Sequence, residues 1–123
     1  MLPKKFRLHA DSDIKRLVRG GKTFFLPQIT IKYQPNNQDL LRIGFVVSTK
    51  VDKRAVVRNR VKRRMREALR SELGNIKNGN DLLFIAKKSC VDMSLSDMIK
   101  QIQFALRTTR LYNESDVKGI KKN

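Results

Sequence analysis

The sequence predicts an α+β fold in which helices pack on a single small sheet. Three observations support this class. The chain has 123 residues, enough for one hydrophobic core. Three segments space their apolar residues as amphipathic helices do, and the segments between them carry the alternating or continuous apolar runs of strands. The predicted order is helix, strand, strand, helix, strand, helix, with the first strand region either continuous or split in two. We expect one domain over 1–123, with a core at about 6–112 and a loose basic tail at 113–123.

The first part of the chain predicts a short helix followed by two strands. The helix begins near Asp11 or Ser12 and ends at Gly20-Gly21. Residues 24–33 are rich in aromatic and β-branched side chains, which predicts a strand with one polar face. A second alternating run, 41–47, follows a segment rich in turn residues. Because only this turn separates the two runs, we expect them to pair as a hairpin.

A strongly basic helix is predicted from Lys53 or Arg54 to Leu73. The segment 50–70 contains ten Lys or Arg residues against two acidic ones. At about 100° per residue, five apolar residues fall within an arc of about 120°, and most basic side chains fill the opposite side. The arc consists of Val57, Val61, Met65, Ala68 and Leu69. Arg58 lies at its edge, where a long guanidinium stem is expected to pack and orient the helix as well as to contact a nucleic acid.

The last strand and helix complete the pattern. Residues 82–86 form a continuous apolar run, as expected of a central strand covered on both faces. Ser94 is the expected N-cap of a closing amphipathic helix, with Asp97 completing a capping box. If the second and third strands are parallel neighbours, the basic helix is their crossover. We expect the helices to cover one face of the sheet and the other face to be open.

The charge of the chain points to a polyanionic partner. The formal net charge is +17 and the pI is about 10.7, so the free protein repels itself and favours nucleic acid. Pairing within the basic helix can neutralise only a few of its cations, so Arg60, Arg63 and Arg64 are expected to bind phosphate. These residues alone support RNA or DNA binding and do not choose between them.

Other classes of function are disfavoured. No apolar run reaches the roughly 18 residues of a membrane span, and the amino end lacks a secretory apolar stretch, so we expect the protein to act in the cytoplasm. Cys90 is the only cysteine and is expected to be a plain small side chain. His9 is the only histidine and the acidic residues are dispersed, which favours neither a catalytic set nor a metal site. Any catalysis is expected to come from a partner.

Two stretches of the chain closely resemble the protein subunit of bacterial ribonuclease P. They are Arg42-Ile43-Gly44-Phe45-Val46-Val47-Ser48 with Lys50, and Ala55-Val56-Val57-Arg58-Asn59-Arg60-Val61-Lys62-Arg63-Arg64-Met65-Arg66-Glu67. Weaker similarity covers roughly 6–112. The resemblance implies a fold similar to a ribosomal-protein domain, with an unusual left-handed crossover that carries the basic helix.

The resemblance also implies a role in a ribonucleoprotein. In this family a large RNA subunit performs the Mg²⁺-dependent hydrolysis that frees the mature 5′ end of transfer RNA, and no Mg²⁺ is held stably by the protein alone. The implied protein is a noncatalytic subunit, one per RNA, that binds the catalytic RNA and the 5′ leader of precursor tRNA. The residues expected to face the catalytic RNA are Lys53, Arg54, Arg58, Asn59, Arg60, Lys62, Arg63, Arg66 and Arg70.

The leader is expected in a cleft between the first helix and the open face of the sheet. The candidate contacts are Ile14, Val18, Lys32, Ser48, Lys50 and Lys88. Many relatives carry phenylalanines where Ile14 and Val18 stand, and an aromatic side chain where Lys32 stands, so apolar contact and charge are expected to replace base stacking here. Phe24 and Phe25 are close in sequence, but a core position on a strand face is favoured for both.

Three alternative functions remain. A structural, ribosomal-type rRNA-binding protein would share the size, charge and fold, but the arginine-asparagine-arginine motif favours the ribonuclease P subunit. A DNA-binding regulator is less favoured because no second short helix is joined to the basic one by a tight turn. A membrane-active cationic helix is least favoured because the apolar arc is needed for the core.

Overall fold

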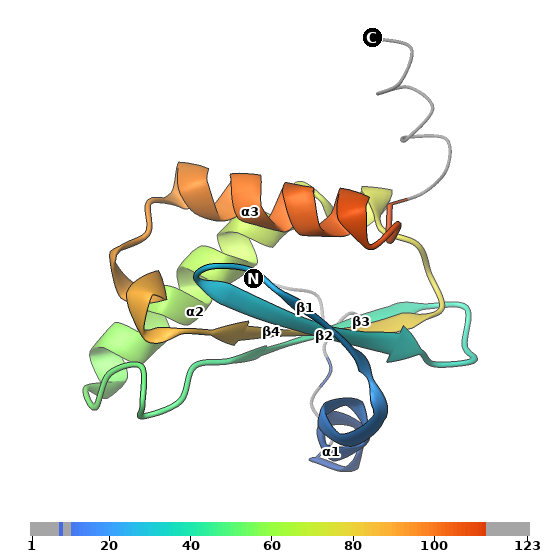
Figure 1. The fold of residues 1–123 in the computed structure, drawn as a ribbon, viewed down its shortest axis with the longest axis horizontal. Helices are drawn as coiled ribbons and strands as arrows, with labels where there is room; N and C mark the ends of the chain where they lie inside the picture. Colours follow the sequence, from blue (N-terminus) through green and yellow to red (C-terminus); the bar gives the residue numbers. More distant parts are fainter. Residues whose placement is uncertain (1–7, 9–10, 113–123) are drawn as a thin grey trace, which may run out of the picture.

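The computed structural model describes Leu8 and residues 11–112, which form three helices around a four-stranded sheet (Figure 1). The expectations for His9 and for the tail 113–123 lie outside these residues. The elements are α1 (Asp11–Gly20), β1 (Lys22–Phe25), β2 (Ile29–Pro35), β3 (Leu41–Val46), α2 (Ala55–Arg70), β4 (Asn80–Ala86) and α3 (Leu95–Thr108), with 3-10 turns η2 (Leu73–Asn75) and η3 (Lys88–Asp92). The predicted α+β class is confirmed.

The strand order in the sheet is β1-β2-β4-β3. β4 pairs antiparallel with β2 and parallel with β3, and β1 pairs antiparallel with β2. Leu82, Leu83 and Phe84 are fully buried, as a strand with neighbours on both edges and cover on both faces requires. The predicted central position of this strand is confirmed, and so is the parallel pairing that makes α2 a crossover. The left-handed sense of this crossover stays a prediction.

The expected hairpin of β2 and β3 is wrong, because β4 lies between the two strands. The segment joining them bends back through Asn36 and through Asn37, whose φ is 58°. The Asn36 N–H donates to the Gly79 carbonyl at 2.8 Å, and the Gly79 N–H donates to the Leu40 carbonyl at 2.7 Å. These bonds hold the start of β4 inside the turn. A wholly apolar strand gains most from the central position, which explains why a strand distant in sequence displaced the local pairing.

The expected strand over 24–33 is split in two. Pro27 has no N–H to donate to a ladder, and the Leu26 N–H donates to the Ile29 carbonyl at 2.9 Å to close a tight turn. β1 and β2 therefore form a hairpin with each other, and β1 becomes an edge of the sheet.

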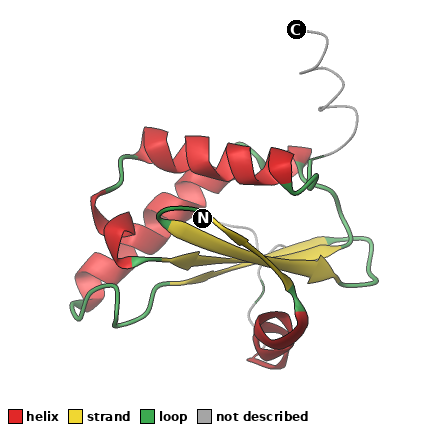
Figure 2. Ribbon diagram, in the orientation of Figure 1, coloured by secondary structure: helices red, strands yellow, loops and turns green. Residues whose placement is uncertain are grey.

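The sheet has helices on both faces, in unequal numbers. Figures 1 and 2 show α2 and α3 together on one face and α1 on the other. The large core cluster lies under α2 and α3, and a smaller cluster of Leu8, Leu17 and Leu83 lies under α1. The expectation of one covered face is correct for α2 and α3, whereas α1 covers part of the face expected to be open.

The helix ends follow local chemistry. α2 ends at Arg70, earlier than the expected Leu73, and the chain continues into η2. The Ser94 hydroxyl accepts from the Asp97 N–H at 3.0 Å and caps α3 as predicted. Gly21 allows α1 to meet β2, since a Cβ there would lie 2.6 Å from the Leu17 carbonyl oxygen and 3.2 Å from that of Tyr33.

Candidate nucleic-acid interface

The helix α2 divides into a buried apolar stripe and an exposed basic face. All five residues of the predicted arc, Val57, Val61, Met65, Ala68 and Leu69, are buried. Asn59, Arg60 and Arg63 are exposed on the other side, while Lys62 and Arg66 are half-buried. The packing of the stripe against α3 and the sheet therefore fixes which cations point outward.

Four cations of this face have no protein counter-charge. The side chains of Arg60, Lys62, Arg63 and Arg66 make no hydrogen bond or ion pair with any residue that the structure describes. Arg70 approaches Glu67 at 3.5 Å, but both side chains are more than half exposed, so this pair contributes less than about 1 kcal/mol. The face is thus available to an external anion.

The amino end of α2 is organised by Asp52 and Arg58. The Asp52 carboxylate accepts from Arg54 Nε at 3.1 Å, Arg54 Nη2 at 3.0 Å and the Arg54 backbone N–H at 2.8 Å. The hydrogen bond from the Arg54 side chain is the main reason that the pKa of Asp52 is lowered to about 2. Arg58 Nη1 donates to the carbonyls of Asp52 at 3.1 Å and Lys53 at 2.8 Å. These bonds agree with the orienting part of the role expected for Arg58, and its contact with a nucleic acid stays a prediction.

Arg64 differs from the expectation that it is free to bind phosphate. Its Nη1 donates to the Met93 carbonyl at 2.6 Å, and more weakly to the Val91 carbonyl at 3.4 Å. The side chain is half-buried and ties α2 to the segment before α3. A guanidinium used in this way reaches backbone carbonyls that would otherwise lack donors. Arg64 is therefore bonded within the protein, unlike the cations of the basic face that have no partner among the described residues.

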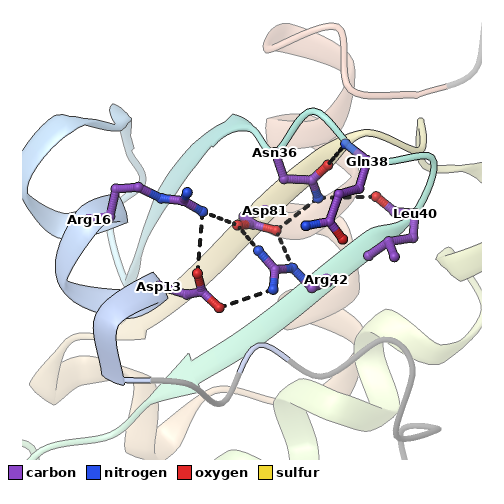
Figure 3. Close-up of polar contacts among 7 residues, drawn as sticks. All are labelled: Asp13, Arg16, Asn36, Gln38, Leu40, Arg42 and Asp81. Atoms are coloured by element: carbon purple, nitrogen blue, oxygen red, sulfur yellow. Dashed lines mark hydrogen bonds and ion pairs between the residues drawn. The ribbon is translucent and has the colours of Figure 1, made fainter.

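The position of α1 is fixed by a polar network at one end of the sheet (Figure 3). The Asp81 carboxylate is fully buried and accepts from Arg42 Nε at 2.9 Å, Arg42 Nη2 at 2.8 Å and Asn36 Nδ2 at 2.9 Å. From α1, Arg16 Nη2 donates to Asp81 at 3.2 Å, and Asp13 accepts from Arg42 Nη1 at 3.0 Å. The hydrogen bond to Asp81 is the largest cause that raises the pKa of Arg42.

The network joins α1, β3, β4 and the turn after β2 through charge-assisted bonds that the sequence pattern did not reveal. Arg42 belongs to a strand of the recognisable motif, but its partners Asp81 and Asp13 lie 39 and 29 positions away from it in the sequence. An aspartate directly before the apolar run 82–86 is the one signal in the sequence that could have pointed to this network, because a carboxylate in a buried strand needs partners.

Two predicted leader residues on α1 have different environments. Ile14 is half-buried and packs against the Leu8, Leu17 and Leu83 cluster, so it mainly holds α1 on the sheet. Val18 is 48% exposed. Val18 is thus available for apolar contact with a ligand, and Ile14 is only partly so.

Of the other four predicted leader residues, one lies on the α1 face of the sheet and three lie beyond the carboxyl ends of its parallel strands. Lys32 pairs with Leu83 and Thr23 in the ladders, which places it on the α1 side, and its Nζ donates to Thr23 Oγ1 at 2.8 Å. Ser48 and Lys50 follow β3, and Lys88 follows β4; all three are exposed. Because β3 and β4 are parallel, their carboxyl ends lie at the same end of the sheet, and these three residues follow those ends.

Phe24 and Phe25 separate to opposite faces of the sheet. Phe24 packs on the large core, with its ring centroid 6.2 Å from that of Phe104, as expected. Phe25 is 73% exposed, so the expected core position is wrong for it. The ladder register decides this, because Phe24 pairs with Ile31 on the face of the large core and Phe25 pairs with Thr30 on the α1 face.

The described residues contain no group of three or more His, Cys, Asp or Glu side chains suited to a metal ion. Cys90 is fully buried, and burial raises the pKa of its thiol to about 11, which fits the predicted plain side chain. Among the helices described, none is long and apolar enough to cross a membrane.

Comparisons with known proteins agree with this architecture. The family model described as Ribonuclease P matches residues 2–110. The ribonuclease P protein component of Caldanaerobacter subterraneus is 34% identical over 116 residues, covering 94% of this chain and 99% of that protein. The corresponding protein of Clostridioides difficile is 38% identical over 103 residues, covering 83% and 90%.

Solved structures show the same fold. The RNase P protein of Staphylococcus aureus superposes with a TM-score of 0.79 at 26% identity, covering 89% of this chain and all of that one. The RNase P protein of Thermotoga maritima gives a TM-score of 0.75 at 25% identity, covering 83% and 96%. With the family match over nearly the whole chain, the chain belongs to the ribonuclease P protein component family.

Proposed function

We propose that this chain is the noncatalytic protein subunit of a ribonuclease P ribonucleoprotein and that it binds the catalytic RNA through the exposed face of α2. The observation that carries this proposal is the division of α2 into a buried apolar stripe and a face on which four cations, Arg60, Lys62, Arg63 and Arg66, have no partner among the described residues. Phosphate groups of RNA supply the missing counter-charge, and guanidinium groups bind phosphate in a bidentate manner. The proposed contacts are Lys53, Arg54, Arg58, Asn59, Arg60, Lys62, Arg63, Arg66 and Arg70.

Within this set the structure supports different roles. Arg60, Lys62, Arg63 and Arg66 are the main candidates for phosphate contacts because nothing in the described protein competes for them. Arg54 is already paired with Asp52, so an RNA phosphate must compete with a carboxylate there. Arg58 would act mainly by holding the segment that precedes the helix.

A second surface, on the α1 side of the sheet, would hold the 5′ leader of precursor tRNA. This surface offers an apolar contact from Val18, a hydroxyl from Ser48 and cations from three lysines. The lysines are Lys32, on the α1 face, and Lys50 and Lys88, beyond the ends of β3 and β4. A single-stranded leader matches this combination, since it presents phosphates for the lysines and bases for apolar contact. Ile14 would contribute mainly by supporting α1.

Hydrolysis itself is assigned to the RNA subunit, with Mg²⁺ at the RNA active site. The protein would raise the affinity for precursor tRNA by contacting a part of the substrate that mature tRNA lacks. Such contacts discriminate substrate from product without any catalytic side chain. We place the site of action in the cytoplasm, where tRNA precursors are made, with one protein per RNA.

A reconstitution experiment tests this proposal. The protein is added to a bacterial ribonuclease P RNA at low Mg²⁺, and cleavage of a precursor tRNA with a 5′ leader is followed. We expect stimulation by the wild type and its loss in the double variant Arg60→Ala, Arg63→Ala. The double variant Lys100→Ala, Arg107→Ala, which removes two exposed cations from α3, is the matched control and should stimulate normally. No stimulation by the wild type would refute the proposal and favour a structural rRNA-binding role.

A further inference from the structure

Phe25 is an exposed aromatic side chain that protein packing does not explain. It is the last residue of β1 and, at 73%, the most exposed large apolar side chain in the part of the chain that the structure describes. Exposing a phenylalanine ring costs about as much as its burial would gain, on the order of 2 kcal/mol. A single exposed ring is not by itself a binding site, so its surroundings decide whether it can take part in one.

The sheet register places Phe25 on the same face as α1. Phe25 pairs with Thr30, Thr30 pairs with Ile85, and Ile85 pairs with Val46, so these four side chains form one row across all four strands. The row spans about 14 Å, three strand spacings. Ile85 and Val46 are half-buried and pack against the cluster under α1. The row is therefore a partly apolar surface beside α1 with Phe25 at its outer end.

Lys87 holds the Phe25 ring and adds charge next to it. Its Nζ lies 5.9 Å from the ring centroid and donates to the Leu26 carbonyl at 2.6 Å. The hydrogen bond fixes the ammonium, and the ammonium in turn favours one orientation of the ring by a cation–π interaction. One ring face is occupied by this cation, and the high exposure of the side chain leaves most of the remainder open to solvent. Lys88, also exposed, follows directly in the chain.

We propose that Phe25, oriented by Lys87, is a stacking platform for one base of the 5′ leader. This inference rests on the proposed function and adds to it a specific aromatic contact. The occupant is single-stranded RNA because Lys87 lies over the ring, and Lys32 and Lys88 lie on the same face of the sheet or just beyond the end of β4. Stacking tolerates any base, so the platform would serve leaders of differing sequence.

The test uses the reconstituted holoenzyme and two ligands, a precursor tRNA with a leader and the mature tRNA. Phe25→Leu should weaken binding of the precursor about tenfold, as expected for the loss of one base–aromatic stack, and leave mature tRNA unchanged. Phe25→Tyr, which keeps the ring, should bind like the wild type. Phe104→Leu is the matched control, because Phe104 is an exposed ring, 52% accessible, on α3.

A scan of the leader with single abasic nucleotides locates the stacked base. At one position the abasic substitution should remove the difference between wild type and Phe25→Leu, because the two changes delete the same interaction. Equal affinity of Phe25→Leu and wild type for the precursor would overturn this inference, and so would an equal loss for mature tRNA or no coupling at any leader position. Failure of the wild type to prefer precursor over mature tRNA would instead refute the proposed leader-binding function.

Discussion

Replacing Asp81 by asparagine tests whether the buried network positions α1 for binding. The Asp81 side chain is fully buried and accepts four hydrogen bonds, two from Arg42, one from Arg16 and one from Asn36. Asparagine has nearly the same shape, but it presents only one acceptor oxygen and turns an N–H₂ group toward cationic donors. The substitution therefore removes the counter-charge of Arg42 with little change in volume.

The expected loss of stability follows from the geometry. Removing one partner of a buried ion pair costs about 3–5 kcal/mol. Arg42 keeps its bond to Asp13 at 3.0 Å and its side chain is 19% exposed, so we expect a loss at or just below the lower end of this range, about 2–3 kcal/mol. With a urea m-value of about 1.5–2 kcal/mol/M, the unfolding midpoint should fall by about 1–2 M.

The expected effect on binding separates positioning from stability. At a temperature where the variant is folded, its affinity for the catalytic RNA should be unchanged, because α2 is on the opposite face of the sheet (Figure 1). Its preference for precursor over mature tRNA should fall several-fold, since α1 loses the bonds that hold it over the sheet. Asp92→Asn, which removes an exposed carboxylate with the same change in net charge, is the control. A destabilised Asp81→Asn protein with a normal leader preference would refute the positioning role, and a loss below about 1 kcal/mol would refute the energetic reasoning.

Three further predictions concern individual charged residues. Arg60→Ala should weaken association with the catalytic RNA and lower the slope of log affinity against log salt by about one; an unchanged slope would place Arg60 outside the interface. Lys32→Ala should reduce the affinity gained by lengthening the leader without affecting the affinity for mature tRNA. Lys22→Ala, which removes a lysine from the opposite face of the sheet, should leave both affinities unchanged. Equal losses of affinity for both ligands in Lys32→Ala would contradict the assignment. Because folding lowers the pKa of Asp52 from 3.8 to about 2, the stability difference between wild type and Asp52→Asn should be fully present above about pH 4 and vanish as the pH falls toward 2. Urea unfolding of both proteins across this range measures it, and a difference independent of pH would show that the Arg54 pair adds no stability.

Local periodicity was sufficient to predict α2. The positions of Val57, Val61, Met65, Ala68 and Leu69 depend only on the helical repeat, and all five are buried. The same repeat identified the exposed basic face but could not show that the Arg64 side chain is bonded within the protein, because its carbonyl partners belong to the segment before α3. The sequence alone determines which face of a helix is apolar. The role of a basic residue at the border of that face depends on the segments that pack beside it.

Strand pairing was less predictable because it depends on competition among distant segments. The apolar content of 82–86 predicted a central strand, yet the hairpin expected from the short turn at 35–39 required β2 and β3 to be neighbours, and both could not be true. Pro27 was a readable sign of the break between β1 and β2. The face on which Phe25 lies depends on the register that this break creates, so its exposure could not be predicted from the composition of 24–33.

The division of labour within Arg58-Asn59-Arg60 explains how one short segment can serve two surfaces. Ser48 and Lys50, at the end of β3, belong to the proposed leader surface, and Lys53 and Arg54 begin the proposed catalytic-RNA surface. Arg58 Nη1 bonds the carbonyls of Asp52 and Lys53 in this connection, and Val51 is buried within it. Arg60, by contrast, has no partner among the described residues and is free for phosphate. In the proposed function, the first arginine of the motif would fix the spacing between the two surfaces, and the second would make the contact with RNA. A change at Arg58 should disturb both RNA ligands, whereas a change at Arg60 should disturb only one.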